Sequence, residues 1–323
     1  MLFFVSCKDK KQYYEESGTV FHTLYTIKYE APHILTDKID AELQKFNLSL
    51  NPFNPNSIIA KVNNNEAVEV DEWFTEVFNK SMEVSRNSDG VFDITCAPLV
   101  NLWGFGFNKK DSVTPAMIDS LKTFVGYRKV HLEGKKVVKD DPRLLLNCSA
   151  IAKGYSCDVI ARLLEKEGVE NYMILIGGEV VVKGVNQNGV CWRTGINLPE
   201  DDPDGIKNNY DEIVQLCKKG AIATSGNYRN FYIKDGKKYA HTIDPRTGYP
   251  AEQSVLSATI VANDCMTADA YATAFMAMGL EKARQMADSL PEIEYYVIYA
   301  DENGKHQIEY SKGMLQYLPK RKQ

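Results

Sequence analysis

A histidine in a run of turn-forming residues is the first group in this sequence that could do chemistry. His241 stands in "YAHTIDPRTGYP" (239–250), where Asp-Pro and Thr-Gly dipeptides follow a strand-like run. Tight turns at these dipeptides would hold the histidine at a strand end. An imidazole there can act as a general base near neutral pH. The alternative is a structural role, which is the commoner one for a lone strand-end histidine.

A carboxylate and a hydroxyl form a second candidate group. Asp269 and Thr273 lie four residues apart in "MTADAYATAFMAMG" (266–279), so both project from one face of an expected helix. The alanines around them leave room for a ligand. An oxygen-only donor pair suits Mg²⁺ rather than zinc. The alternative is that Asp269 only interacts with the helix dipole.

Lys153 is the third candidate. It follows a run of small residues in "NCSAIAKGYSCD" (147–158), at an expected strand-to-helix junction. Such a junction exposes backbone amides that can receive a phosphate, and the lysine adds a point charge. The alternative is a solvated lysine at a helix start. The sequence has neither G-x-G-x-x-G nor G-x-x-x-x-G-K-[ST], which excludes the two common nucleotide-binding loops.

The elements that position these groups follow from periodicity. Helical spacing of apolar residues predicts helices over 35–47, 71–87, 114–126 and 149–168, and a further helix from about Met266. Period-two alternation predicts one strand over 18–30, a hairpin over 129–140 and two strands broken by Gly177-Gly178. Further strands are expected over 221–226, 230–234, 238–243 and 254–262, with a final pair over 294–311. This pattern predicts a single α/β domain (mixed α+β), with mixed β-sheets flanked by helices.

Composition limits the possible partners. The chain has 323 residues, is 44% hydrophobic and 25% charged, and carries a net charge of −5. These values are typical of a globular protein. Its one dense basic run is "KRKQ" at the C-terminal end. We therefore expect no nucleic-acid partner.

The N-terminal residues resemble the lipobox of bacterial lipoproteins, because Val5-Ser6-Cys7 is followed at once by a charged stretch. The apolar run is shorter than the ~7–15 residues of a signal peptide, so either its first residues are missing or its start is misassigned. We expect residues 1–16 to be a lipoprotein signal remnant and tether. Cys7 would then be lipidated, and the domain would face the periplasm from the inner membrane. The alternative is a chance cysteine.

The other six cysteines show no metal-binding pattern. None of them forms a C-x-x-C pair, and no histidines lie at zinc-ligand spacing. Most stand in apolar, strand-like or helix-like surroundings. We expect small core residues rather than a disulfide framework.

Six motifs in order resemble the ApbE-type FAD:protein FMN transferases, from about residue 17 to the C-terminus. They are "FNPNSIIAKVN", "DGVFDITCAPLVNLWGFG", "SAIAKGYSCD", "IGGEVVVKG", "SGNYRNFY…YAHTIDPRTGYP" and "MTADAYATA". Members of this family, often lipoproteins, split FAD with Mg²⁺ and attach the FMN half through its phosphate to Thr or Ser of a partner flavoprotein. The resemblance implies that residues 17–323 form one such domain.

The resemblance also implies roles for individual residues. The magnesium ligands would be the backbone oxygen of Ala150 and the side chains of Asp269 and Thr273, and His241 would be the base. Flavin-nucleotide contacts would come from Ser17, Phe53, Val91, Phe92, Asp93, Asn147, Lys153 and Ile243. Three of these depart from the family pattern, which usually has Met at Ser17, Tyr at Phe53 and Asp at Asn147. Phe53 can still stack on a ring, whereas Asn147 removes a charge.

Two other functions remain open. The same site could hydrolyse FAD to FMN and AMP with water as the acceptor, or the protein could be a non-catalytic FAD-binding lipoprotein. The acceptor of a transferase would carry the motif Asp-x-x-Thr/Ser-Gly-Ala/Ser-Thr. "DPRTGYP" partly resembles this motif, but Tyr249 and Pro250 break it. We therefore do not expect the chain to modify itself.

Overall fold

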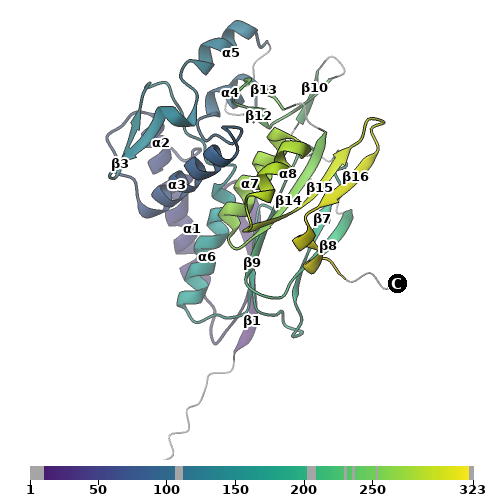
Figure 1. Cartoon of the computed structure of the whole chain (residues 1–323). Helices are drawn as coiled ribbons and strands as arrows, with labels where there is room; N and C mark the ends of the chain where they lie inside the picture. The colour runs from purple at the N-terminus through teal and green to yellow at the C-terminus, as the bar shows by residue number, and fades with distance from the viewer. Residues whose placement is uncertain are drawn as a thin grey trace, which may run out of the picture.

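The computed structural model describes residues 11–105, 112–201, 209–228, 231–234, 237–251 and 254–319. Its largest element is an eight-stranded sheet of order β1-β2-β5-β6-β9-β14-β15-β16 (Figure 1). Every neighbouring pair in this sheet is antiparallel. The strands are β1 (Gln12–Val20), β2 (Thr23–Ala31), β5 (Tyr172–Ile176), β6 (Glu179–Lys183), β9 (Gly220–Gly226), β14 (Val255–Ala262), β15 (Ile293–Ala300) and β16 (His306–Tyr310).

Helices cover one face of this sheet in two layers (Figure 1). α6 (Ala152–Lys166) contacts β5 and β6, and α7 (Cys265–Met278) contacts β9 and β14. α1 (Thr36–Leu50) packs on α6, and α3 (Glu72–Asn87) packs on α7. The mixed α/β class expected from the sequence is therefore confirmed. The other helices are α2 (Ile58–Asn63), α4 (Ala97–Leu102), α5 (Pro115–Lys122) and α8 (Leu280–Asp288).

The opposite face of the sheet is covered by a two-stranded sheet of β7 (Trp192–Asn197) and β8 (Tyr210–Leu216). Along β6, Val181 belongs to the core beneath the helices, whereas Val180 and Val182 pack with Trp192 and Val214 of the β7–β8 pair. Both faces of β6 are thus buried. This is why its sequence is continuously apolar instead of alternating.

α6 and α7 cap each other. The Asp158 carboxylate of α6 accepts hydrogen bonds from the backbone N–H groups of Cys265 (2.9 Å) and Met266 (2.8 Å). Asp269 of α7 accepts one from the N–H of Gly154 at 3.0 Å. A Cβ on Gly154 would lie 2.2 Å from the Cys265 carbonyl oxygen, so only glycine permits this approach. The first turns of both helices are thereby locked together.

A smaller apolar cluster lies at one end of the molecule, where Figure 1 shows α4, α5, β10, β12 and β13 together. It contains Leu99, Ile118 and Ile243. The short strands of the chain are β3 (Val130–Glu133), β4 (Lys136–Lys139), β10 (Phe231–Lys234), β11 (Lys237–Ala240), β12 (Ile243–Asp244) and β13 (Tyr249–Pro250), and they form two-stranded sheets. At this end of the protein, the β10–β11 and β12–β13 pairs are therefore local hairpins outside the main sheet.

The single strand expected over 18–30 is wrong, because a turn divides it into β1 and β2. Phe21 and His22 form that turn with φ angles of 51° and 60°. Glycine, asparagine and aspartate are the usual residues at such positive angles. Neither turn residue belongs to that set, so no turn could be predicted here from the residue types.

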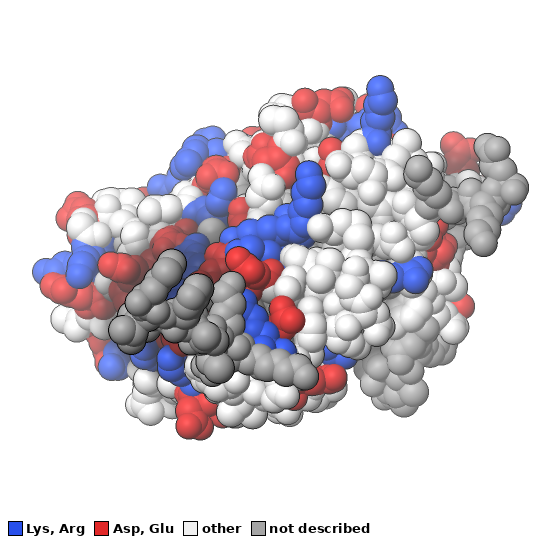
Figure 2. All heavy atoms as spheres, turned by 90° about the horizontal axis from the view of Figure 1, so that it is seen from below, with Lys and Arg blue, Asp and Glu red and all other residues white. Residues whose placement is uncertain are grey.

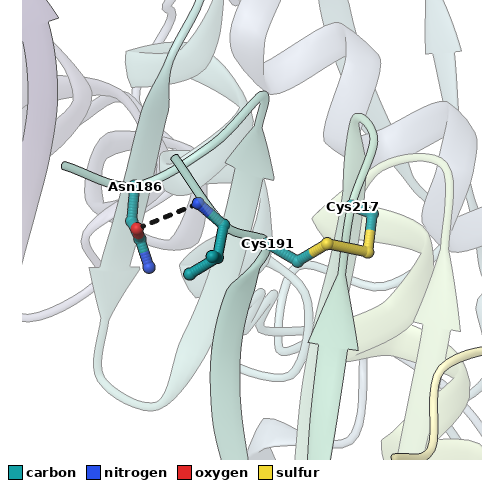
Figure 3. Close-up of a disulfide and its surroundings, with 4 residues drawn as sticks. Asn186, Cys191 and Cys217 are labelled. Carbon is teal, nitrogen blue, oxygen red and sulfur yellow. Dashed lines mark hydrogen bonds between the residues drawn. A yellow bond between two sulfur atoms is a disulfide. The ribbon is translucent and has the colours of Figure 1, made fainter. Parts of the chain in front are cut away.

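The expectation of small core cysteines without disulfides is confirmed for four of the six cysteines and wrong for the other two. Cys96, Cys148, Cys157 and Cys265 are buried and free. Cys191 and Cys217, however, form a disulfide across 26 residues of sequence (Figure 3). It joins the residue before β7 to the residue after β8, so it closes the open end of that hairpin. Figure 3 also shows the preceding turn, where Asn186 accepts a hydrogen bond from the Val190 N–H at 3.4 Å.

On the surface seen from below, basic and acidic side chains intermingle beside a broad area without charged residues (Figure 2). No helix in the described ranges is long and apolar enough to cross a bilayer. The expected lipidation site, Cys7, lies outside the described residues.

Candidate active site

A cavity of about 740 Å³ brings the predicted site residues together. It lies where the β5–β6 turn and the end of β9 meet the first turn of α6 and the middle and end of α7. Every site residue expected from the sequence except Ser17 lines it: Phe53, Val91, Phe92, Asp93, Asn147, Ala150, Lys153, His241, Ile243, Asp269 and Thr273.

Ser17 lies elsewhere. It is exposed on β1, the edge strand of the main sheet, and its hydroxyl lies 3.1 Å from that of Thr26 on β2. It is not among the cavity-lining residues. The structure therefore does not place Ser17 with the other expected flavin contacts.

Three charged side chains meet at the inner end of the cavity. Lys153 donates a hydrogen bond to Glu179, and its Nζ lies 3.8 Å from Oδ1 of Asp269. The side chains of Glu179 and Asp269 are only 4% and 3% exposed. Burial alone would lower the pKa of Lys153. The nearby carboxylates of Asp269 and Glu179 have the larger effect and raise this pKa. The lysine is therefore a stable cation, and the cluster as a whole attracts a further positive charge.

Glu179 was not singled out by sequence reasoning. It follows Gly177 and Gly178, which turn the chain with φ angles of 67° and 110°. Burial raises the pKa of its carboxyl group. Within the part of the chain that the structure describes, its Oε2 is buried and has no hydrogen-bond partner. The available signal was a glutamate between a Gly-Gly turn and an apolar strand, where a carboxylate is costly unless it is paired.

The oxygens near Asp269 fit a hard divalent cation. Asp269 keeps Oδ1 for a ligand, because its Oδ2 accepts from Gly154. The Thr273 hydroxyl lies 3.2 Å from that of Ser225 on β9, and Ala150 lines the cavity beside them. In the described ranges, no group of three or more His, Cys, Asp and Glu is placed to hold a metal. A cation here would therefore be held by mixed oxygen donors, as Mg²⁺ often is.

His241 lies on the outer side of the cavity, between β11 and β12. Its ring meets that of Phe105 edge-on, with 6.4 Å between centroids. The neighbouring Asp244 and Arg246 form a two-pronged ion pair with N–O distances of 3.0 and 2.9 Å. These two groups therefore build the turn that follows His241.

That turn is packed from both sides. The Gly248 N–H donates to the Asp244 carbonyl at 2.7 Å, and Trp103 donates to the Gly248 carbonyl at 2.8 Å. Gly248 has a φ of 82°, and a Cβ there would lie 2.4 Å from Cγ2 of Ile118. The turns expected from the sequence at this motif are therefore present and fixed against α5.

Two residues that were expected to contact the flavin, Asp93 and Asn147, form hydrogen bonds within the protein. The Asp93 carboxylate accepts hydrogen bonds from the N–H and hydroxyl of Thr95 and from the N–H of Tyr127, each at 2.7 Å. Burial raises its pKa, although these bonds oppose the rise. Asn147 accepts from the Ser149 N–H at 2.9 Å. Both residues shape the loops beside the cavity, and neither presents a free charge to it.

A family model described as "ApbE family" matches residues 21–297 of the chain. The chain belongs to the ApbE family. It is 35% identical to the FAD:protein FMN transferase of Vibrio cholerae over 90% of this chain and 88% of the relative. The Escherichia coli K12 protein of that name is 33% identical, over 78% of this chain and 73% of the relative. The resemblance expected from the motifs is confirmed.

Solved ApbE structures share the fold. The flavin transferase ApbE from Vibrio cholerae superposes with a TM-score of 0.85 at 34% identity, covering 96% of this chain and 100% of that one. The apo form of the Pseudomonas stutzeri flavinyl transferase ApbE gives 0.84 at 26% identity, covering 95% and 97%.

Proposed function

We propose that this ApbE-family protein is a Mg²⁺-dependent FAD:protein FMN transferase. The observation that carries the proposal is one cavity that is lined by Lys153, by the buried carboxylates of Glu179 and Asp269, and by His241. Its volume of about 740 Å³ suits a cofactor-sized ligand. Relatives at 33–35% identity bear this activity in their names.

The transfer would exchange one P–O bond for another. The hydroxyl oxygen of an acceptor Thr or Ser forms a bond to the phosphorus on the FMN side of FAD. The bond from that phosphorus to the bridging oxygen breaks, and AMP leaves with this oxygen. A ring nitrogen of His241 takes the hydroxyl proton, because a hydroxyl that keeps its proton is a poor nucleophile. The product is FMN joined to the acceptor through a phosphodiester.

The inner residues hold the reacting phosphates. The Lys153 ammonium would pair with pyrophosphate oxygens, as a compact point charge does. Asp269, Thr273 and the backbone oxygen of Ala150 would hold Mg²⁺. When bound, the metal neutralises charge that develops on the phosphoryl oxygens. The acceptor would be a flavoprotein bearing Asp-x-x-Thr/Ser-Gly-Ala/Ser-Thr.

The direct test is incubation of the protein with FAD, MgCl₂ and a domain bearing this motif, read by in-gel flavin fluorescence and by the mass of the acceptor. A fluorescent acceptor that gains the mass of FMN minus water supports the transferase. Release of FMN and AMP with an unmodified acceptor would instead indicate a hydrolase. FAD binding without AMP release would indicate a non-catalytic FAD-binding protein.

We also propose that Cys7 carries a lipid and that the domain faces the periplasm. The Val-Ser-Cys junction supports an anchor, and the Cys191–Cys217 disulfide supports an oxidising compartment. In Figure 1 the start of β1 and the β12–β13 hairpin, which follows His241 in the chain, lie at opposite ends of the molecule. Membrane fractionation of the native precursor tests this, and a soluble cytoplasmic product would refute it.

A further inference from the structure

Lys153 stands between two buried carboxylates and hydrogen-bonds to only one of them. It donates to Oε1 of Glu179, whereas Oδ1 of Asp269 lies 3.8 Å from its Nζ, beyond hydrogen-bond distance. Both carboxylate side chains are almost fully buried. The ammonium therefore has two possible partners at close range, and the fold selects Glu179.

The choice matters because Asp269 has one oxygen to spare. Its Oδ2 accepts from the Gly154 N–H, so Oδ1 is the atom left for a cation. If Lys153 moved onto that oxygen, its own positive charge would occupy the place of the metal. A carboxylate bonded to an ammonium is a poorer cation ligand, because its charge is already compensated at close range.

Three separate elements fix this arrangement. Lys153 is in the first turn of α6, Asp269 is on α7, and Glu179 begins β6 after the Gly177-Gly178 turn. A Cβ on Gly177 would lie 3.1 Å from Cδ of Lys153, so the turn also packs against the lysine stem. Glu179 is further held where its carbonyl accepts from the Cys157 thiol at 3.4 Å. The sheet, and not the helix pair, therefore sets where the ammonium points.

We propose that Glu179 is a positioning residue: it holds the Lys153 ammonium off Asp269 and so keeps Oδ1 of Asp269 available to a divalent cation. This inference rests on the proposed function, because it assumes a cation at Asp269. It adds a role for a residue that needs to touch neither the cation nor the acceptor. A merely structural Glu179 would neutralise Lys153 without affecting the affinity of the protein for the cation.

Mn²⁺ binding to the full chain separates these roles without relying on turnover. MnCl₂ is titrated into the protein, and free Mn²⁺ is followed by its paramagnetic resonance signal. In Glu179→Gln, Lys153 loses its charged partner and moves to Asp269. We expect the Kd for Mn²⁺ to rise about tenfold, the factor equivalent to 1.4 kcal/mol. Replacing the lysine as well, in Glu179→Gln/Lys153→Met, should restore binding toward the wild-type value.

Two further variants keep the test decisive. Lys153→Met alone should bind Mn²⁺ at least as tightly as wild type. This variant still tests the positioning role if Glu179→Gln does not fold. Glu165→Gln is the matched control, because Glu165 pairs with Lys183 and Lys219 outside the cavity. Its Kd for Mn²⁺ should be unchanged.

Failure of the positioning role and failure of the proposed function would give different results. If Glu179→Gln binds Mn²⁺ like wild type, or if the double variant stays as weak as Glu179→Gln, the positioning role is overturned while the transferase proposal stands. Weaker binding in Lys153→Met than in wild type would also overturn it. If wild type itself binds no Mn²⁺ with or without FAD, the metal site of the proposed function fails, and this inference fails with it.

Discussion

The two walls of the cavity are built in different ways. The inner wall, defined by Lys153, Glu179, Asp269 and Thr273, stands on α6, α7 and β6, all packed into the main core. The outer wall, defined by Phe105, His241, Ile243 and Pro245, lies beside the small cluster around α4, α5 and β12, to which Ile243 belongs. The difference shows where precision is needed. The charges proposed to bind phosphates and metal sit on elements of the main core, whereas the proposed base stands just before a locally braced turn.

This contrast predicts that changes in the inner wall remove all FAD chemistry, whereas changes in the outer wall remove transfer and leave binding. In the proposed mechanism, the inner charges act on the pyrophosphate whatever attacks it, and His241 acts on the attacking hydroxyl alone. Single substitutions in the two walls can therefore separate loss of FAD cleavage from loss of transfer.

The largest effect is expected for Asp269→Asn. The asparagine keeps an oxygen that can accept from the Gly154 N–H, so the fold should persist, but the charge that would hold the cation is lost. We expect AMP release from FAD to fall to the rate seen without metal, with a melting temperature close to wild type. Chromatography of AMP and a thermal melt measure the two.

Asp269→Ala is the companion variant. It should lose the same activity and, in addition, about 0.5–2 kcal/mol of stability, because the cap on α6 disappears. Thr273→Ala should be milder, since a hydroxyl contributes less to a cation site than a carboxylate. Wild-type AMP release in Asp269→Asn would move the metal site away from the inner wall.

His241→Ala should come next. A positioned general base contributes typically ~10²–10⁴-fold, so FMN transfer should fall by roughly that factor while FAD and metal still bind. His241→Asn should fare no better, because an amide cannot take the proton. Transfer rates at saturating FAD, together with FAD binding by fluorescence, test this. Loss of FAD binding would make His241 a cofactor contact and would merge the two walls.

Sequence alone predicted the inner wall unevenly. The four-residue spacing of Asp269 and Thr273 and the place of Lys153 at a helix start follow from helical periodicity. The mutual capping of α6 and α7 does not, because it joins residues 107–115 positions apart in the chain. Glu179 was missed for the same reason. Its importance arises from a lysine that reaches it across 26 residues.

The outer wall was more accessible to prediction, because its structure is local. Asp-Pro and Thr-Gly turns could be recognised in "DPRTGYP", and both are used. The pairing of Asp244 with Arg246 two residues later was not foreseen, although it is equally local. The β1–β2 turn was not predicted, because Phe-His is not a usual turn pair. The disulfide was not predicted, because spacing alone does not tell which cysteines meet.

The disulfide should stabilise the fold without touching either wall. Cys191→Ser/Cys217→Ser removes a link across 26 residues, which typically costs about 2–4 kcal/mol of unfolding free energy. We expect a lower denaturant midpoint and an unchanged transfer rate at 25 °C. Denaturant unfolding with and without a reductant measures the first, and only wild type should respond to the reductant. A large drop in transfer rate would show that the β7–β8 hairpin, whose Thr194 and Tyr210 line the cavity, is a third working wall.

The smallest effect is expected at the cavity edge, for Phe53→Ala. Phe53 is 52% exposed and its ring meets the His22 ring edge-on, with 5.8 Å between centroids, so it would add a single ring contact to a flavin. A ring contact is worth about 0.5–1.5 kcal/mol, so the KM for FAD should rise roughly two- to tenfold with kcat unchanged. Ser17→Ala is the matched control, since its hydroxyl bonds to Thr26 outside the cavity and its loss should alter neither constant. If Ser17→Ala raises the KM more than Phe53→Ala does, the β1–β2 hairpin takes part in FAD binding. The family-based expectation for Ser17 would then be correct, and the boundary of the cavity would have to be extended to the edge of the sheet.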